Sequence, residues 1–286
     1  MKSNTQIAND VNEAKYKSRR AATSPWMIRL ARLGYTVKGI VYVVIGWLAG
    51  MLAIGHGGKA TDQSGAIQTI NSLPLGKFLL VVVAIGLLGF ALWSFIQALF
   101  DTEGKGRDAK GIASRIGYAV VGASYALLGY ATFQIVVGTG GGASNSTSRT
   151  QDWTALLLNQ HFGPALVIIV GMGVLGVAVY LFVKAYSANF KSRLNLAQLS
   201  AKMRKLMIDL GRFGYAALGV VFSIIGIFLI VAAYQHNAKQ AVGLDGALRE
   251  LARQPFGQLL LGIIALGLIA YGLYSFVEAR YRRLGG

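Results

Sequence analysis

The stretch that decides the fold is RLGYTVKGIVYVVIG, residues 32–46, because the same pattern returns twice. The second copy is RIGYAVVGASYALLG at residues 115–129, and the third is RFGYAALGVVFSIIG at residues 212–226. Arginine, the Gly-Tyr pair and two later glycines keep the same spacing in all three copies. Repetition in register predicts that one structural unit is copied three times along the chain.

A second apolar segment follows each copy after a loop, beginning at Gly76, Gly163 or Gly257. From these glycines the three segments align without gaps, with small residues 10 and 13 positions on and phenylalanine 19 positions on. Each unit is therefore predicted to be a pair of apolar helices. The six predicted helices run over about 28–54, 78–100, 116–137, 165–185, 213–233 and 259–279.

The composition places these helices in a membrane. Hydrophobic residues make up 54% of the chain and charged residues only 14%, whereas a soluble domain carries about 25% charge. A helix needs ~20 apolar residues to cross a bilayer, which each segment supplies. The predicted fold class is an all-α membrane protein whose six transmembrane helices form three parallel two-helix repeats with pseudo-threefold symmetry.

The basic residues predict the orientation. Of the 28 Lys and Arg residues, 22 fall on the side that holds both termini and only 6 on the other side. By the positive-inside rule, both termini are cytoplasmic. The expected partners are the lipid bilayer and anionic inner-leaflet lipids; a protein partner and a homo-oligomer are further candidates.

The chain divides into five predicted segments. They are a basic tail (1–24), repeat 1 (25–104), repeat 2 (105–189), a cytoplasmic amphipathic helix (190–210) and repeat 3 (211–286). The amphipathic helix lies either on the inner leaflet or on the loops of its own protein, since its periodicity fits both. Short outer helices are predicted at 62–73, 152–160 and 245–254, each beginning near an aspartate, and the glycine- and serine-rich run 138–148 is predicted to be a flexible linker.

The repeated glycines are predicted to pack helices together, because a residue without a side chain lets two backbones approach closely in lipid. Close approach to a ligand is the alternative. The predicted packing residues are Gly34, Gly39, Gly46, Gly117, Gly122, Gly129, Gly214, Gly219 and Gly226 in the first helices, and Gly86, Gly89, Gly173, Gly176 and Gly267 in the second helices.

A candidate polar cluster consists of Gln97, Lys184 and Glu278, which occupy equivalent positions near the cytoplasmic ends of the second helices. They either meet at an inner mouth, with Lys184 and Glu278 paired, or remain separate, with Glu278 paired to an arginine such as Arg282. The same candidate cluster includes Arg32, Arg115 and Arg212, which begin the first helices. They either bind lipid phosphates or neighbouring helix ends, or are ordinary flanking charges of the positive-inside kind. Lys38 has no charged counterpart in the other copies, is interpreted as separate from the repeat pattern, and can snorkel.

The Arg-x-Gly-Tyr-x3-Gly helix, the outer loop that ends in Pro255-Phe256-Gly257 and the glycine-rich second helix together resemble a family of bacterial membrane proteins, the domain-of-unknown-function 1206 family. The resemblance covers residues 26–284 and implies three two-helix units in a bacterial inner membrane. It implies no activity. The middle copy departs from the pattern, with His161-Phe162-Gly163 at the corresponding place.

The residues needed for most chemistry are missing from the sequence. There is no cysteine and there are only three histidines, and no G-x-S-x-G, H-E-x-x-H or phosphate-loop motif occurs. We expect no enzyme activity, cofactor, metal or nucleic-acid partner. The leading hypothesis is a structural or interaction role, with a link to envelope stress as one possibility. The alternative is a channel or carrier for a small or anionic solute along the pseudo-threefold axis.

Overall fold

The computed structural model describes residues 25–100, 108–139, 144–195 and 199–282. The basic tail predicted at 1–24 lies outside them. The described part holds nine α-helices and two short 3₁₀ turns, and its only strand-like pairing is an isolated bridge between Leu194 and Arg282. The elements are α2 (Pro25–Ala53), α3 (Gln63–Asn71), α4 (Gly76–Phe100), α5 (Ala109–Val137), α6 (Ser146–Leu158), α7 (Gly163–Ser187), η1 (Asn189–Arg193), α8 (Ala201–Tyr234), η2 (Ala238–Gln240), α9 (Leu244–Arg253) and α10 (Gly257–Tyr281).

Six of these helices are long and apolar enough to cross a membrane, as the sequence predicts: α2, α4, α5, α7, α8 and α10. Their ends follow local signals. The Asp108 side chain accepts a hydrogen bond from Gly111 N–H and caps the start of α5, and Gly138 ends the same helix with a left-handed φ of 77°. An aspartate cap satisfies a free N–H group, and glycine adopts positive φ without strain.

The long helices pack in one continuous order: α5, α4, α2, α10, α8 and α7. In three of these contacts the second helix of one repeat packs along the first helix of the next: α4–α5, α7–α8 and α10–α2. We call these contacts the inter-repeat seams. The third seam returns from the last repeat to the first, so the repeats follow one another in a cycle.

The same residue positions meet in every inter-repeat seam. A Cβ atom added at Gly122 would lie 3.1 Å from the Phe95 ring, one at Gly219 would lie 2.9 Å from Phe182, and one at Gly39 would lie 2.8 Å from Phe276. These phenylalanines are the equivalent residues 19 positions into each second helix. One helical heptad further on, the equivalent pairs are Gly129 with Leu88, Gly226 with Leu175 and Gly46 with Ile269. The predicted packing role of these six glycines is therefore confirmed.

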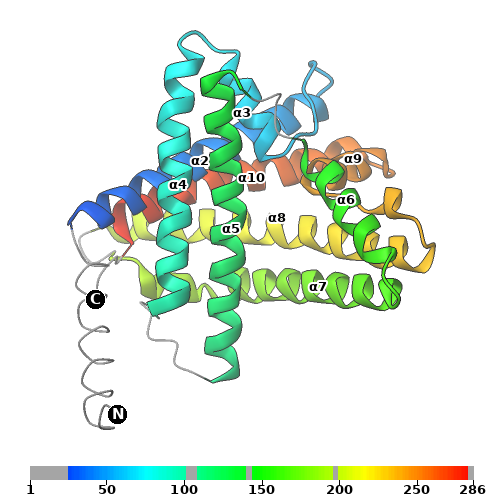
Figure 1. Cartoon of the computed structure of the whole chain (residues 1–286). Helices are drawn as coiled ribbons and strands as arrows, with labels where there is room; N and C mark the ends of the chain where they lie inside the picture. The colour runs from blue at the N-terminus through cyan, green and yellow to red at the C-terminus, as the bar shows by residue number, and fades with distance from the viewer. Residues whose placement is uncertain (1–24, 101–107, 140–143, 196–198, 283–286) are drawn as a thin grey trace.

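The two helices of repeats 1 and 3 meet differently, over a shorter contact and at other glycines. In repeat 1, a Cβ atom at Gly34 would lie 2.6 Å from the Phe90 Cβ, and one at Gly86 would clash with Val37. In repeat 3, Gly214 meets Tyr271 in the same way and Gly267 meets Ala217. A shorter contact lets helix pairs cross, and Figure 1 shows α4 and α5 running across α7 and α8.

Repeat 2 breaks the pattern, because its two helices, α5 and α7, do not pack against each other in the described structure. Within the described ranges, no heavy atom of another element lies within 4 Å of a Cβ atom added at Gly117, Gly173 or Gly176. These three glycines make no close helix contact among the described residues, so their packing role stays a prediction. Gly89, by contrast, packs on Leu30 as predicted.

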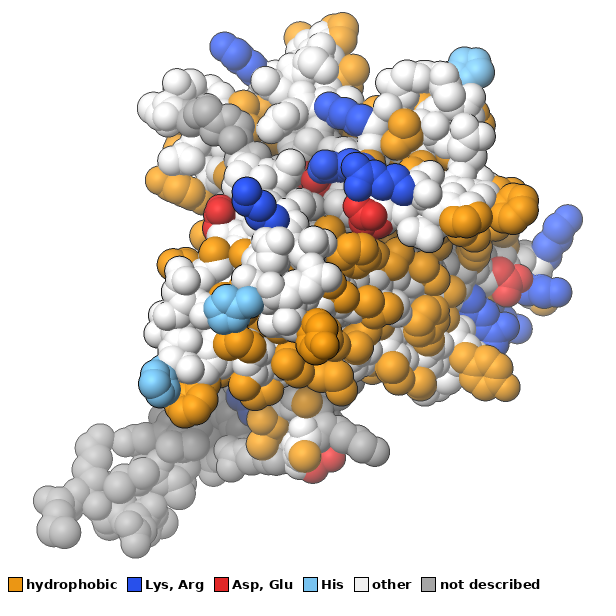
Figure 2. All heavy atoms as spheres, turned by 90° about the vertical axis from the view of Figure 1, so that its right-hand side faces the viewer, with side chains coloured by type: hydrophobic (Ala, Val, Ile, Leu, Met, Phe, Trp, Pro, Cys, Tyr) orange, Lys and Arg blue, Asp and Glu red, His pale blue; other side chains and the backbone are white. Residues whose placement is uncertain are grey.

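Apolar side chains cover much of the molecular surface. Large exposed hydrophobic residues lie along both α5 and α7, among them Leu127 at 67% exposure and Ile169 at 66%. Figure 2 shows hydrophobic side chains gathered over one face, with a band of charged side chains above them. Since water would disfavour so large an apolar surface, the surface fits a helical protein embedded in lipid.

Three local predictions need correction. The second outer helix, α6, begins at Ser146 with Asn145 as its cap, so the run 138–148 is only partly a linker and Asp152 lies inside the helix. The third, α9, begins after Gly243, and Asp245 lies in its first turn. The segment predicted as a separate amphipathic helix is instead a 3₁₀ turn followed by the first residues of α8, which continue directly into the fifth span. The first outer helix begins after the cap Asp62, as expected.

Candidate functional site: a buried charge cluster and an outer-loop junction

A cluster of charged side chains lies buried between α2 and α10. Glu278 Oε1 lies 2.8 Å from Arg282 Nη1, and Glu278 Oε2 lies 3.4 Å from Lys38 Nζ. The side chains are only 6–9% exposed. We call these three residues the charge cluster. It joins the first repeat to the third at the seam that closes the cycle.

Aromatic rings surround the cations of the charge cluster. Lys38 Nζ lies 4.7 Å from the ring centre of Tyr271, 5.3 Å from that of Tyr35 and 5.5 Å from that of Phe90. The Arg282 guanidinium lies 5.0 Å from the Tyr35 ring centre. A cation over an aromatic face is stabilised by the ring quadrupole, by up to about 2 kcal/mol once water is excluded. The rings therefore offset part of the cost of burying Lys38.

The charge cluster carries two cations and one carboxylate, so Glu278 is the counter-ion for both. In a low-dielectric site an unpaired charge is far more costly than a paired one. Lys184, from α7, also lies within electrostatic range of Glu278, and its Nζ sits 3.9 Å from the ring centre of Tyr215. The carboxylate thus pairs directly with cations of the first and third repeats, and a cation of the second repeat lies in its electrostatic surroundings.

The structure therefore brings together only some of the candidate residues named from the sequence. Glu278 pairs with Arg282, as one of the two sequence hypotheses predicts, while Lys184 stacks on Tyr215. Gln97 is buried in α4 at 3% exposure. The expectation that Lys38 snorkels is wrong, because its side chain points into the packed contact with α10. The sequence did contain a sign that Lys38 is buried, because it lies on one helical face with Tyr35, Gly39 and Tyr42.

The repeated arginines cap the preceding repeat. Arg115 donates from Nε to the carbonyl of Ala98 at 2.6 Å and from Nη2 to the carbonyl of Leu99 at 3.0 Å, at the end of α4. Arg212 Nη2 donates to the carbonyl of Tyr186, the equivalent residue of α7, at 3.3 Å. Arginine satisfies carbonyls that a helix end leaves free and complements its negative dipole. The alternative of binding neighbouring helix ends is thus confirmed for these two.

Arg32 occupies the same position in the first copy, but its side chain is exposed. No such bond joins it to the described end of α10. The C-terminal carbonyls of that helix lie near the bridge between Leu194 and Arg282 instead, and Asn195 N–H donates to the Tyr281 carbonyl at 2.7 Å. The segment that follows α7 therefore takes the place that arginine holds in the other two seams.

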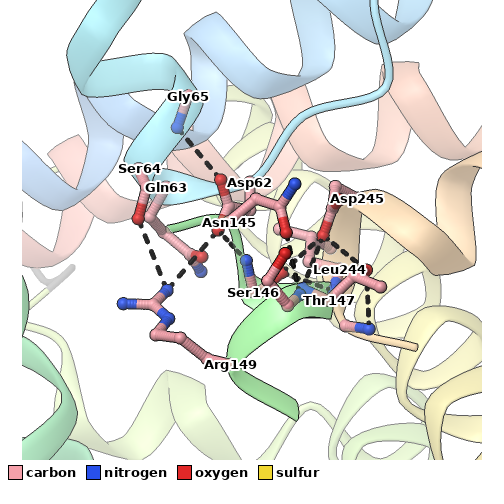
Figure 3. Close-up of polar contacts among 12 residues, drawn as sticks. Asp62, Gln63, Ser64, Gly65, Asn145, Ser146, Thr147, Arg149, Leu244 and Asp245 are labelled. Atoms are coloured by element: carbon pink, nitrogen blue, oxygen red, sulfur yellow. Dashed lines mark hydrogen bonds and ion pairs between the residues drawn. The ribbon is translucent and has the colours of Figure 1, made fainter. Parts of the chain in front are cut away.

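On the opposite side, the outer loops of all three repeats meet at the start of α6 (Figure 3). Asp62, from repeat 1, is completely buried; its Oδ2 accepts a hydrogen bond from Ser146 N–H at 2.6 Å and lies 3.5 Å from Arg149 Nη2. Its Oδ1 accepts from Gly65 N–H at 3.0 Å and so caps α3. One carboxylate therefore binds the first N–H groups of two helices.

Asp245, from repeat 3, binds the same helix start. Its Oδ1 accepts from Thr147 N–H at 2.9 Å, from the Thr147 hydroxyl at 2.7 Å and from the Ser146 hydroxyl at 2.9 Å, and its Oδ2 pairs with Arg249. The two hydroxyls in turn accept from the backbone of α9: Leu244 N–H bonds to Ser146, and Gly243 N–H and Gly246 N–H bond to Thr147. We call this arrangement, with Asp62, the outer junction.

The outer junction satisfies every free N–H group in the first turn of α6. Asp62 binds Ser146 N–H, Asp245 binds Thr147 N–H, and the Asn145 side chain binds Ser148 N–H at 2.8 Å. Two carboxylates at a helix N-terminus are also favoured by the helix dipole. Sequence reasoning missed this junction, although Asn145-Ser146-Thr147 is a good helix-start signal that was hidden inside a glycine- and serine-rich run.

Neither arrangement offers a catalytic constellation. The described residues contain no group of three His, Cys, Asp or Glu side chains that could hold a metal ion. The carboxylates of Asp62, Asp245 and Glu278 are each bound by cations or by N–H and O–H donors. Such groups are positioned to hold helices together.

Comparison with known proteins gives a consistent result. A family model described as "Domain of Unknown Function (DUF1206)" matches three times, at residues 33–101, 116–188 and 213–282. A protein of Bacillus subtilis (strain 168), described as "Uncharacterized protein YxxB", is 38% identical over 271 residues, which cover 94% of this chain and 97% of the relative. No solved structure matches the chain significantly.

Proposed function

Because the chain belongs to the DUF1206 family, with three family units covering most of its length, we propose that it serves as a structural or interaction protein of the bacterial plasma membrane. Both termini face the cytoplasm in this proposal, since the basic side of the chain carries 22 of its 28 Lys and Arg residues. The Bacillus subtilis relative supports the proposal that the membrane is bacterial.

The observation that carries the proposal is the packing of the inter-repeat seams. A carrier would need a polar, water-accessible path between the repeats, whereas a packing protein would be closed at Gly39, Gly122 and Gly219. All three glycines are buried against a phenylalanine ring, and a Cβ atom at Gly39 would lie 2.8 Å from the Gly272 carbonyl oxygen of α10. This backbone contact between α2 and α10 favours a closed seam.

The cyclic order of the seams also supports a pseudo-threefold arrangement about the membrane normal, with all three repeats pointing the same way. The helix pairs that cross in Figure 1 can still span one bilayer, because transmembrane helices tilt by up to about 40°. The interruption between α5 and α7 is the departure from such symmetry.

Thiol accessibility tests the proposal, since the natural chain has no cysteine. Single cysteines replace Ile45, Leu87 or Val221, which are 0% exposed and lie deep in three different spans. In intact cells a membrane-impermeant maleimide should label none of them, while Lys59→Cys, on the exposed outer loop, should react. Labelling at two or more of the span positions would indicate a water-filled path and overturn the proposal.

A further inference from the structure

The second repeat leaves two complementary helix faces unpaired. In repeat 1, Gly34 and Val37 of α2 fit against Phe90 and Gly86 of α4. The equivalent residues in repeat 2 are Gly117 and Val120 on α5, and Val177 and Gly173 on α7. Val120 is 60% exposed and Val177 is 43% exposed, and among the described residues nothing lies within 4 Å of a Cβ atom added at either glycine. We call these the α5 face and the α7 face.

The other two repeats show what fits each face. The α7 face corresponds to surfaces of α4 and α10 that hold the first helix of a repeat, and the α5 face corresponds to surfaces of α2 and α8 that hold a second helix. Small residues at this crossing permit backbone contact in lipid. The surface that fits the α7 face is therefore an α5 face, and the reverse is equally true.

The outer junction opposes pairing of the two faces within one chain. Helix α6 leads directly into α7, and its first turn is bound to Asp62 of repeat 1 and Asp245 of repeat 3. Gln151 further attaches α6 to the carbonyls of Lys239 and Ala241. Movement of α7 onto α5 would have to carry α6 with it and break these hydrogen bonds.

We propose that two copies of this chain associate in the membrane, the α5 face of each packing against the α7 face of the other. In such a dimer each α5 face and each α7 face makes, with the other copy, the helix contact that repeats 1 and 3 make within one chain. Such a dimer is isologous, the commonest symmetry among homo-oligomers. The proposal identifies the partner in the interaction role proposed above and rests on that role.

The test uses two copies with different tags, expressed together on the cysteine-free background. One carries Val120→Cys on the α5 face, and the other carries Val177→Cys on the α7 face. In membranes, a short thiol crosslinker should join the two copies into a dimer that carries both tags. The matched control is Val179→Cys, which lies on the opposite side of α7 at 61% exposure, and it should give no dimer with Val120→Cys.

A packing variant separates a specific interface from chance collision. Gly173→Leu adds a side chain where nothing lies within 4 Å, so the single copy should still fold, with an unchanged thermal transition. The same variant should abolish the dimer crosslink. By contrast, Gly86→Leu, at the equivalent position of repeat 1, should prevent folding because its side chain would collide with Val37.

Three results would overturn the proposal. They are a crosslink that forms only within one chain carrying both cysteines, the absence of any crosslink, and a dimer that Gly173→Leu leaves unchanged. The first result means that α5 and α7 close on each other, and the second means that lipid or another protein covers the faces. None of them depends on labelling at Ile45, Leu87 or Val221, so failure of the dimer and failure of the closed seams can be told apart.

Discussion

Removal of the Glu278 charge should destabilise the protein more than removal of the Lys38 charge, although the two side chains form one ion pair. The charge cluster contains two cations and one carboxylate, with side chains 6–9% exposed. Glu278→Gln removes the carboxylate that both buried cations contact. Breaking a buried pair in this way costs about 3–5 kcal/mol.

Lys38→Met has a smaller expected effect because it leaves a neutral pair. Glu278 keeps its contact with Arg282 at 2.8 Å, and only the longer contact of 3.4 Å is lost. The methionine side chain fills similar space between Tyr35 and Tyr271. The cation–π contribution that disappears is at most about 2 kcal/mol, and relief of the buried excess charge offsets part of it. We therefore expect a net loss of about 1 kcal/mol.

The free energy of unfolding can be measured in mixed detergent micelles, with tryptophan fluorescence following a titration with dodecyl sulfate. Glu250→Gln is the matched control, since Glu250 also lies 2.8 Å from an arginine, Arg253, but that arginine is 71% exposed. Exposed pairs contribute about 0–1 kcal/mol. Equal losses for Glu278→Gln and Lys38→Met, or a Glu278→Gln loss no larger than that of the control, would refute the reasoning.

Three further predictions concern the seams and the junction. Gly122→Leu should separate α4 from α5, because a Cβ atom there already lies 3.1 Å from the Phe95 ring; folded yield by size-exclusion chromatography checks it, and normal yield contradicts it. Asp245→Ala should destabilise the start of α6 by about 3 kcal/mol through the loss of charged hydrogen bonds. Hydrogen exchange of the backbone amides at the start of α6 should become faster in this variant. It should stay unchanged in the control Asp152→Ala, which removes an exposed aspartate. Arg115→Met should free two helix-end carbonyls and cost about 1–2 kcal/mol, which thermal unfolding in detergent measures.

The repeat and its helices could be predicted from the sequence because their cause is local. Glycines seven residues apart fall on one face of a helix, so Gly39 and Gly46 had to lie on a contact surface if they packed at all. The identity of the contacting helix could not be read in this way. A glycine has no side chain to specify its partner, and the same spacing would fit a neighbour from the same repeat or from the next one.

The two polar arrangements were hidden for a different reason, since each depends on residues far apart in the chain. Lys38 and Glu278 are 240 positions apart, and Asp245 meets Thr147 across 98. No helical period links such residues. The repeat alignment even concealed Lys38, because a residue without counterparts in the other copies seemed unrelated to the packing that all copies share.

The open second repeat follows from one substitution that the alignment does reveal. Fourteen residues into the second helix, repeats 1 and 3 carry Phe90 and Tyr271, whose rings pack edge-on against Tyr35 at 5.0 Å and Tyr215 at 5.4 Å between centres. Such a pair contributes about 0.5–1.5 kcal/mol beyond its buried area. Repeat 2 carries Val177 there, which has no ring to make this contact. The crossing of α5 and α7 loses the contact that holds the other two crossings together, and both glycine faces stay available to a second chain.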